Sequence, residues 1–361
     1  MGGGKIIKNK RMRKIMKQPQ ITSGVLRLQR RNIPILLAAL LCLLPFETTA
    51  QIARQAKNGI IITRRGGHVR AMEPFRGVVT GGGDYAGALN RYQKALGPDV
   101  HIYSMLIPTA VEFYCPPECA SWSNREKPVI ENINRQFSPE ITVVDAYSVL
   151  KSHVGEEIYA RTDHHWLPLG AYYCAEAFAQ AAEVPFFDLS HYEQRVVHNF
   201  VGTMSKFSGD PSVKQDPEEF IYHVPADSNY VTTYVGHNLG KGRVVTGLTE
   251  PFEGPFFLSY KDGSAQAYCT FMGGDTRTTH VHTATENGRR LMIIKDSYGN
   301  AVPGYLFQSF EDIYVVDFRY FQKNIVAYAR EKGITDLLFV NNLQHAYAPT
   351  TTRYFINMLN K

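Results

Sequence analysis

Cysteine is scarce in this sequence and occurs only five times in 361 residues. Cys115 and Cys119 are close together, but they form a lone pair, and a structural zinc site needs two further ligands. Three residues separate them, whereas a redox motif has two residues between its cysteines. The few cysteines therefore argue against a zinc module and a dithiol oxidoreductase. We expect Cys115 and Cys119 to close a small disulfide-bonded loop.

Long apolar runs are also missing. The run over residues 33–46 has about 14 residues, whereas a membrane-spanning helix needs about 20. A basic segment precedes this run and a short stretch ending at Ala50 follows it, which is the layout of a secretory signal peptide. We predict export to the periplasm or cell envelope, with residues 1–50 as the leader. An uncleaved membrane anchor formed by residues 33–46 is the alternative.

An excess of positive charge is missing from the rest of the chain. The formal net charge is +6, but the first 50 residues contain ten of the 39 lysines and arginines and only one of the 33 acidic residues. The remaining residues therefore carry a net charge of about −3. The basic residues belong to the leader, so we expect no nucleic-acid partner.

The remaining chain has the composition of a globular protein, with 44% hydrophobic and 20% charged residues. Short apolar stretches alternate with segments of helical spacing, which predicts an α/β fold with a mostly parallel sheet and helices on its faces. The predicted strands are 59–63, 77–80, 100–107, 141–144, 291–294, 312–316 and 336–340, and the predicted helices are 85–96, 125–137, 146–154, 168–183, 301–310, 321–332 and 350–359.

Residues 188–288 have a different character. Glycines, prolines, aromatic residues and threonine-rich stretches replace the helical spacing there. We interpret this segment as a β or irregular insertion within one domain that spans residues 51–361. Such an insertion could form a lobe that contacts the substrate.

Polar residues follow three of the C-terminal strands. In doubly wound sheets, ligands bind beyond the carboxyl ends of the strands. Ser297 stands where a strand turns toward a predicted helix, whose positive end would favour a developing oxyanion. A serine at such a position can also simply cap the helix. Strand-end position alone makes four further residues candidates for oxyanion or substrate binding: Arg319, Tyr320, Asn341 and Asn342.

Asp163 and His165 lie in a loop before the helix predicted at residue 168. A serine nucleophile needs a base, and the base needs a carboxylate that orients it. Asp163 and His165 can supply both, although together with His164 they could instead hold a metal ion. His280 and His282 would share one strand face, but no carboxylate in the nearby sequence completes a ligand set. We therefore predict no metal site.

Two sequence blocks resemble the DHHW family of exported bacterial proteins. The first reads TDHHW at residues 162–166 and continues as PLGAY at 168–172, and the second reads KDSYGNA at 295–301. The family is similar to the alginate O-acetylation proteins, whose domain has an SGNH-hydrolase-like, flavodoxin-like fold with permuted strand order. The resemblance spans roughly residues 59–361 and is looser in the segment after residue 190, around GTMS at 202–205.

The resemblance implies roles for three residues. Ser297 corresponds to the nucleophile, His165 to the base and Asp163 to the acid that orients it, while His164 receives no role. Lys295 replaces the glycine of the ordinary SGNH block, and no residue matches the usual oxyanion donors.

The function that the resemblance implies is serine-dependent O-acyl transfer or acetyl-ester hydrolysis on an extracytoplasmic polysaccharide, through an acyl-serine. No cofactor is expected. A membrane-bound O-acyltransferase is the expected partner that supplies acyl groups. A non-catalytic carbohydrate-binding or assembly protein with a relict site is the alternative.

Overall fold

The computed structural model describes residues 53–226 and 229–361. The predicted leader, including the apolar run at residues 33–46, lies outside the described residues. Within the described ranges, no helix combines the length and the apolar character that crossing a membrane requires.

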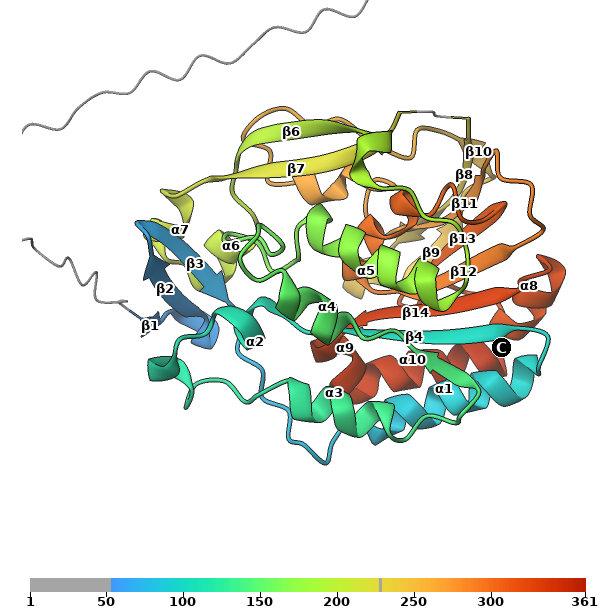
Figure 1. Cartoon of the computed structure of the whole chain (residues 1–361), viewed down its shortest axis with the longest axis horizontal. Helices are drawn as coiled ribbons and strands as arrows, with labels where there is room; N and C mark the ends of the chain where they lie inside the picture. Colours follow the sequence, from blue (N-terminus) through green and yellow to red (C-terminus); the bar gives the residue numbers. More distant parts are fainter. Residues whose placement is uncertain (1–52, 227–228) are drawn as a thin grey trace, which may run out of the picture. The chain divides into compact units, whose positions relative to one another are not determined.

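A nine-stranded sheet forms the centre of the fold (Figure 1). β9 (Val245–Leu248) pairs with β8 outside the main path of the sheet. The other strands, in spatial order, are β10 (Phe252–Glu253), β8 (Val231–Leu239), β11 (Arg277–His282), β13 (Asp312–Asp317), β12 (Arg290–Lys295), β14 (Asp336–Asn342), β4 (His101–Ile107) and β5 (Ile141–Val143).

The sheet is mixed, and not mostly parallel as the sequence predicts. β13, β12, β14, β4 and β5 pair in parallel. β11, β8, β10 and β9 add antiparallel pairs along one side. All four antiparallel strands come from residues 188–288, where short connections replace the crossover helices that parallel pairing requires. Part of this segment is therefore built into the central sheet.

Helices cover both faces of the sheet (Figure 1). α1 (Gly83–Leu96), α3 (Lys127–Asn134), α8 (Ile325–Glu331) and α10 (Pro349–Asn360) form one layer, and α4 (Ala146–Ser152) packs with α5 (Pro168–Ala181) on the other side. α1 illustrates why these segments are helical, because its apolar residues recur at helical spacing and are buried against the core. Gly97 ends α1 in a conformation, at a φ of 79°, that favours glycine.

Smaller elements surround the carboxyl ends of the parallel strands. One small sheet contains β1 (Arg54–Gln55), β2 (Ile61–Arg65) and β3 (His68–Met72), and another contains β6 (Tyr192–Phe200) and β7 (Glu218–Pro225). The short helices are α2 (Ala110–Tyr114), α6 (Met204–Ser208), α7 (Pro211–Lys214) and α9 (Leu343–Tyr347). The 3-10 turns are η1 (Lys57–Gly59), η2 (Pro117–Cys119), η3 (Leu189–His191), η4 (Lys241–Arg243), η5 (Ala267–Thr270), η6 (Ser297–Ala301) and η7 (Pro303–Tyr305).

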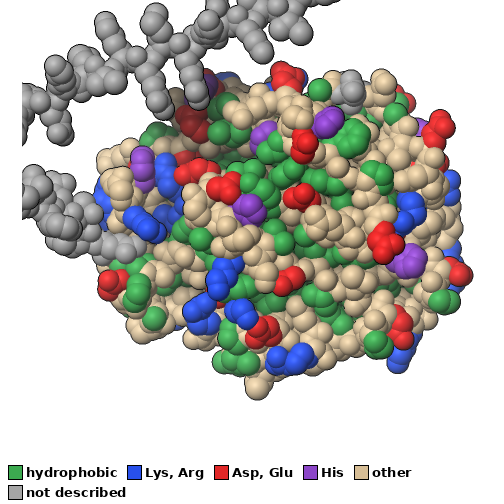
Figure 2. All heavy atoms as spheres, in the orientation of Figure 1, with side chains coloured by type: hydrophobic (Ala, Val, Ile, Leu, Met, Phe, Trp, Pro, Cys, Tyr) green, Lys and Arg blue, Asp and Glu red, His purple; other side chains and the backbone are tan. Residues whose placement is uncertain are grey.

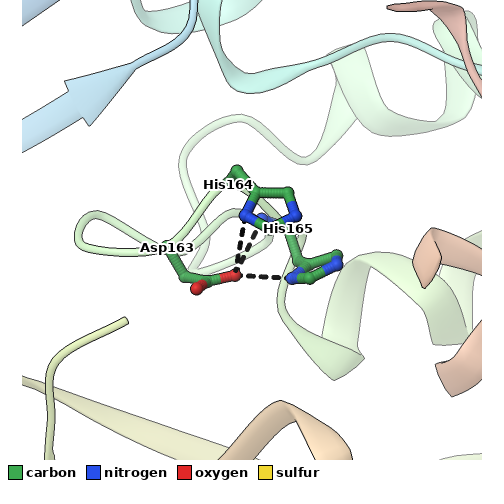
Figure 3. A group of neighbouring side chains, drawn as sticks. All are labelled: Asp163, His164 and His165. Atoms are coloured by element: carbon green, nitrogen blue, oxygen red, sulfur yellow. Dashed lines mark hydrogen bonds and ion pairs between the residues drawn. The ribbon is translucent and has the colours of Figure 1, made fainter. Parts of the chain in front are cut away.

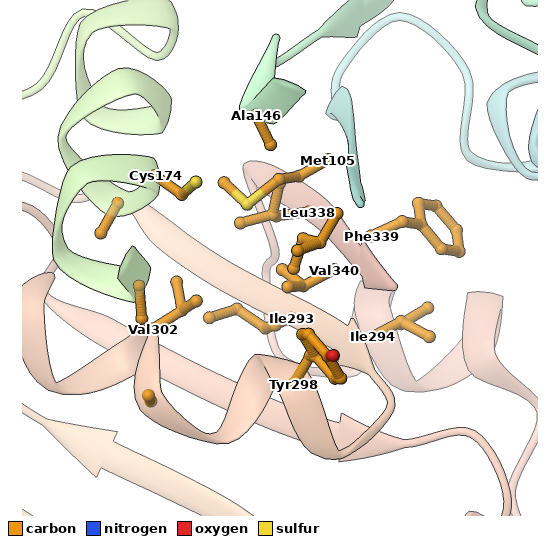
Figure 4. Close-up of a cluster of buried hydrophobic side chains, with 14 of the residues drawn as sticks. Met105, Ala146, Cys174, Ile293, Ile294, Tyr298, Val302, Leu338, Phe339 and Val340 are labelled. Carbon is orange, nitrogen blue, oxygen red and sulfur yellow. The ribbon is translucent and has the colours of Figure 1, made fainter. Parts of the chain in front are cut away.

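The main hydrophobic core lies on both faces of the parallel strands. Ile293 of β12 and Leu338 of β14 are fully buried, and Cys174 of α5 packs above them (Figure 4). Burial of a side chain such as leucine or isoleucine stabilises a fold by about 1.5–3 kcal/mol. The many buried apolar residues of these central strands therefore provide a rigid base for the loops at their carboxyl ends. On the face that Figure 2 shows, acidic and basic side chains are interspersed.

Three local predictions are wrong. Residues 77–80 form no strand, because Val78 and Val79 are exposed and no neighbouring strand pairs with them. Residues 301–310 form no α-helix, because Pro303 lacks a backbone N–H and the following glycine disfavours a helix, so the chain makes short 3-10 turns. Cys115 and Cys119 are free thiols and form no disulfide bond.

Candidate active site

Ser297 lies directly beyond the carboxyl end of β12, within the parallel part of the sheet. The preceding carboxylate, Asp296, accepts hydrogen bonds from the backbone N–H groups of Tyr298 and Asn342, both at 2.9 Å. These bonds tie the end of β12 to the end of β14. Ser297 begins the 3-10 turn η6, and a second short turn, η7, follows where we predicted a helix over residues 301–310.

His165 connects Ser297 to Asp163. Its Nε2 atom lies 2.8 Å from the Ser297 Oγ atom, and its Nδ1 atom lies 2.5 Å from Asp163 Oδ1. A carboxylate beside Nδ1 favours the tautomer that carries its proton there, which leaves Nε2 free to accept the serine proton. The loop between α4 and α5 thus brings the two predicted partners to a serine that lies more than a hundred residues later in the chain.

Asp163 is held by hydrogen bonds to both carboxylate oxygens. Oδ1 accepts the backbone N–H of His165 at 3.1 Å, and Oδ2 accepts the N–H and hydroxyl of Thr203, each at 2.8 Å. A Cβ atom at Gly202 would lie 2.3 Å from the Asp163 Cβ atom, so this close approach requires glycine. The GTMS segment, which the resemblance matches only loosely, therefore positions the carboxylate.

The same contacts keep Asp163 ionised. Burial by itself would raise the pKa of Asp163, but the charge of His165 and the hydrogen bonds from His165 and Thr203 hold that pKa well below the usual carboxyl value. Asp163 therefore carries a negative charge at neutral pH and can stabilise a positive charge on the adjacent imidazole.

Aromatic side chains fix the orientation of the His165 ring. Tyr268 stacks on the imidazole, with ring centroids 3.8 Å apart and an angle of 7° between the planes. The buried indole of Trp166 donates its N–H to the Tyr298 carbonyl at 2.9 Å, and the Tyr298 hydroxyl donates to the carbonyl of His164. The imidazole is thus held beside the serine by packing and by buried hydrogen bonds.

Asp163, His164 and His165 are also the described residues that could hold a metal ion, because one ligand atom of each lies within 4.8 Å of the others (Figure 3). Both Asp163 oxygens already accept hydrogen bonds, and His164 Nδ1 lies 2.7 Å from Thr203 Oγ1. Burial and the neighbouring His165 lower the pKa of His164 to about 4. A metal ion would have to replace these contacts. The arrangement therefore fits a hydrogen-bonded row of Ser297, His165 and Asp163 better than a metal centre.

His280 and His282 do have a carboxylate nearby, which the sequence did not reveal. Their ring nitrogens lie 2.7 Å and 3.0 Å from the same oxygen of Asp312. The other oxygen of Asp312 accepts a hydrogen bond from Arg290 Nε at 3.2 Å. Because an arginine would compete with a metal ion for this carboxylate, the cluster is an ion-pair network and not a preferred metal site.

A cavity of about 750 Å³ opens beside Ser297. Arg319 and Asn342, two of the four strand-end candidates, line it. The Asn342 side chain also accepts a hydrogen bond from the backbone N–H of His345 at 3.0 Å and so caps α9. These two side chains are therefore close enough to the serine to contact a substrate that fills the cavity.

The other two candidates do not line this cavity. The Tyr320 hydroxyl accepts a hydrogen bond from Arg243 Nε at 2.8 Å. Asn341 is fully buried, and its Oδ1 atom accepts a hydrogen bond from the Tyr85 hydroxyl at 2.8 Å. Successive side chains near a strand end point to opposite faces of the sheet, so position at the end of a strand does not by itself place a side chain in the site.

An ion-pair network fixes Arg319 in the lining of the cavity. Its guanidinium donates to the two oxygens of Asp317 at 2.8 Å and 2.6 Å, and lies 3.0 Å from Asp275. Lys295, which is 1% exposed, contacts the same two carboxylates at 2.8 Å and 3.2 Å. Two cations thus alternate with two anions, and the network holds the Arg319 side chain in one orientation.

Sequence reasoning missed several residues that line the cavity, among them His345 and Glu73. His345 Nδ1 lies 3.1 Å from Asp296 Oδ2. Burial alone would lower the pKa of His345, but the Asp296 carboxylate raises it. His345 lies one turn after the predicted strand end at residues 341–342, so extension of that search by one turn would have found it. Glu73 also lines the cavity, although it lies more than 200 residues before Ser297 in the chain. No local sequence pattern marked Glu73 as a site residue.

Comparisons with known proteins agree on one family. The family model described as DHHW protein matches residues 78–316. The solved structure of a DHHW family protein from Eubacterium siraeum is 34% identical to this chain, with a TM-score of 0.76, and the match covers 85% of this chain and 98% of that one. Comparison with curated proteins gives no match.

Two more distant structures are also similar. Bacillus cereus PatB1, solved with a sulfonyl adduct, is 17% identical with a TM-score of 0.63, and the match covers 82% of this chain and 98% of that one. This likeness indicates a shared fold. The O-acetyltransferase domain of Pseudomonas putida AlgJ is 10% identical with a TM-score of 0.43, and the match covers 85% of this chain and 99% of that one.

Proposed function

This chain belongs to the DHHW family, and on that premise we propose that it is an exported, serine-dependent O-acyltransferase that acts on an extracytoplasmic polysaccharide. The observation that carries the proposal is the hydrogen-bonded row of Ser297, His165 and Asp163 beside a cavity. The proposal includes an SGNH-hydrolase-like fold with permuted strand order, because the histidine block precedes the serine block in the chain.

The proposed reaction has two halves. Ser297 Oγ attacks the carbonyl carbon of an acyl ester while His165 Nε2 accepts the serine proton, and that proton then passes to the departing alcohol. An acyl-serine results. A sugar hydroxyl next attacks the acyl carbon, its proton goes to His165, and the bond from the acyl carbon to Ser297 Oγ breaks as the serine regains a proton. Asp163 stabilises the imidazolium in both halves.

We assign the stabilisation of the oxyanion to side chains that line the cavity. Arg319 and Asn342 are the two candidates that line it, and Arg319 is held in place by the carboxylates of Asp317 and Asp275. A donor that is fixed before the reaction begins needs no reorganisation when charge develops on the carbonyl oxygen. We also propose that a membrane-bound O-acyltransferase supplies the acyl groups that Ser297 receives.

Covalent labelling tests the nucleophile. PatB1, which shares the fold, has been solved with a sulfonyl adduct, and we expect an aryl sulfonyl fluoride to label this protein once per chain at Ser297. Mass spectrometry of the labelled peptide checks the position. Labelling at other serines, or none with a folded protein, would favour the alternative of a non-catalytic carbohydrate-binding protein.

Transfer and hydrolysis use the same acyl-serine, so the acceptor decides between them. We expect acetylated sugar when the protein receives p-nitrophenyl acetate together with oligosaccharides, because a transferase holds a sugar hydroxyl near the acyl carbon and disfavours water. Mass spectrometry of the products measures the acetylated sugar, and the Ser297→Ala variant is the negative control. Equal release of acetate with and without sugar, and removal of acetyl groups from a natural glycan, would identify an esterase instead.

Export is a separate prediction. We expect the mature chain to begin near Gln51, because the basic segment, the apolar run at residues 33–46 and Ala50 have the layout of a signal peptide. N-terminal sequencing of protein recovered outside the cytoplasm checks the cleavage site. Recovery of intact residues 33–50 in the membrane fraction would favour the uncleaved anchor.

A further inference from the structure

Glu73 brings a carboxylate to the same cavity as Ser297. It directly follows β3, and its backbone is fixed on both sides. Met72 before it is buried, and Phe75 after it donates its backbone N–H to Ser123 Oγ at 3.0 Å. The carbonyl of Pro74 accepts a hydrogen bond from Gln344 at 3.3 Å. The carboxylate is therefore carried by a rigid segment and lies in the wall of the cavity.

Glu73 is a half-buried charged group of the cavity that lacks a protein partner, as does the exposed Arg76. Among the described residues, no hydrogen bond or ion pair reaches its carboxylate, whereas Arg319 is paired with Asp317 and His345 with Asp296. A half-buried carboxylate without a partner costs free energy that a bound ligand can offset. The oxygens of the Glu73 carboxylate are thus acceptors that a ligand in the cavity can use.

Glu73 lines the same cavity as Ser297 and is affected by the charged groups of the site. Burial raises the pKa of Glu73, His165 and His345 oppose this increase, and the negative charge of Asp163 adds to it. The carboxylate therefore interacts electrostatically with two imidazoles, one of which contacts Ser297. A group in this position can reach a molecule that approaches the acyl carbon.

We propose that Glu73 binds the acyl acceptor, with its carboxylate oxygens accepting hydrogen bonds from hydroxyl groups of a sugar and holding one of them toward the acyl group on Ser297. The inference rests on the proposed function and adds the residue that selects sugar over water. Adjacent sugar hydroxyls are donors, and a carboxylate has two oxygens that can accept from both. Glu73 takes no proton in this step, because the acceptor proton goes to His165.

The role predicts a selective defect. Glu73→Gln and Glu73→Ala should form the acyl-serine at rates within about twofold of the native protein, because the acyl donor does not need this carboxylate. Transfer to sugar should fall by about tenfold to a hundredfold, the range expected for loss of a hydrogen bond to a charged group. The KM for the acceptor should rise, and hydrolysis should take a larger share of the acyl-serine.

The experiment uses p-nitrophenyl acetate as donor and a panel of cello-, xylo- and chito-oligosaccharides as acceptors. The burst of nitrophenolate measures acylation, and mass spectrometry measures the ratio of acetylated sugar to acetate. Glu140→Gln is the matched control, since Glu140 is exposed and lies outside the cavity. The two Glu73 variants and the control are compared with the native protein by circular dichroism and melting temperature, so that misfolding is not mistaken for a binding defect.

The outcomes separate this inference from the proposed function. A normal burst with a reduced ratio of transfer to hydrolysis in Glu73→Gln supports the acceptor role. An unchanged ratio in both variants, or a burst reduced as strongly as transfer, overturns it. A native protein without any burst overturns the proposed function, and the role of Glu73 with it.

Discussion

Replacement of Ser297 by alanine is expected to lower kcat for acyl transfer by about 10⁴- to 10⁶-fold, the loss found when such a nucleophile is removed. The physical reason is that Ser297 Oγ is the atom that would bond to the acyl carbon, and His165 Nε2 at 2.8 Å is the base that would take its proton. Without the oxygen, only binding and the oxyanion donors remain. Ser148→Ala is the matched control, because Ser148 is exposed on α4.

The partners of the serine should behave as one unit with it. His165→Ala should cost about as much as Ser297→Ala, and the double variant should lose little more, because either change alone already disables the nucleophile. Asp163→Asn should lower kcat by about 10⁴-fold through loss of the charge and of the imidazole tautomer. His101→Ala, which changes an exposed histidine at the start of β4, should keep native activity. Additive losses would contradict the single-unit mechanism.

The same assay decides between the serine mechanism and a metal centre at Asp163, His164 and His165. We expect activity to survive dialysis against EDTA. Loss of activity in EDTA and its recovery on addition of zinc would show that these side chains bind a metal ion, and that the serine contact is secondary.

The second large effect concerns stability. Lys295→Met is expected to lower the free energy of unfolding by about 3–5 kcal/mol, the usual result of removing one partner from a buried ion pair. Lys295 is 1% exposed and lies 2.8 Å from Asp317 and 3.2 Å from Asp275. The methionine can fill the space of the lysine stem, so the loss arises from the buried Asp317 and the half-buried Asp275, which then share Arg319 as their one remaining cation.

Urea denaturation followed by circular dichroism measures this loss. The double variant Lys295→Met/Asp317→Leu should lose less than Lys295→Met alone, because Arg319 and Asp275 then remain as a balanced pair. Lys332→Met, which breaks an ion pair at the surface with Glu331, should change stability little. A double variant that loses the sum of both single changes would contradict the coupling.

The sign of the pH dependence follows from the same contacts. Burial alone would lower the pKa of Lys295, but Asp317 and Asp275 raise it above the ordinary lysine value. A group whose pKa is raised by folding contributes its stability fully below its unfolded pKa and loses it as the pH rises through the folded value. The contribution of Lys295 is therefore complete at neutral pH and should decrease only in strongly alkaline solution.

Local physics made part of the fold predictable. The buried residues of α1 recur at helical spacing, and residues 291–294 of β12 are continuously apolar, so their spacing alone indicated a helix and a buried strand. The structure contains both, with ends shifted by one or two residues. The two blocks that carry the family resemblance are also short, continuous segments, which can be recognised without the tertiary structure. The family comparison confirms that resemblance.

Other features depend on contacts between distant segments. The antiparallel pairing of β8 and β11 with the central sheet joins strands about 40 residues apart in the chain, and no local pattern specified that register. Asp163 accepts a hydrogen bond from Thr203, forty residues later in the chain. That contact requires glycine at position 202, because a Cβ atom there would clash with Asp163. A periodicity within one segment contains no information about which distant backbone approaches it.

The sequence by itself determined the α/β class, the parallel strands of the central sheet, the helices that cover it, the likeness to one family, and the residue types Ser297, His165 and Asp163 as candidates for acyl-transfer chemistry. Only the tertiary structure decided that these three side chains meet, that Arg319 and Asn342 line the cavity while Tyr320 and Asn341 do not, and that Glu73 lies in its wall. The physical reason is that helical and strand spacing arises from contacts between neighbours in the chain. A site assembled from five separate segments depends instead on how the whole sheet packs, because that packing sets the direction of each side chain.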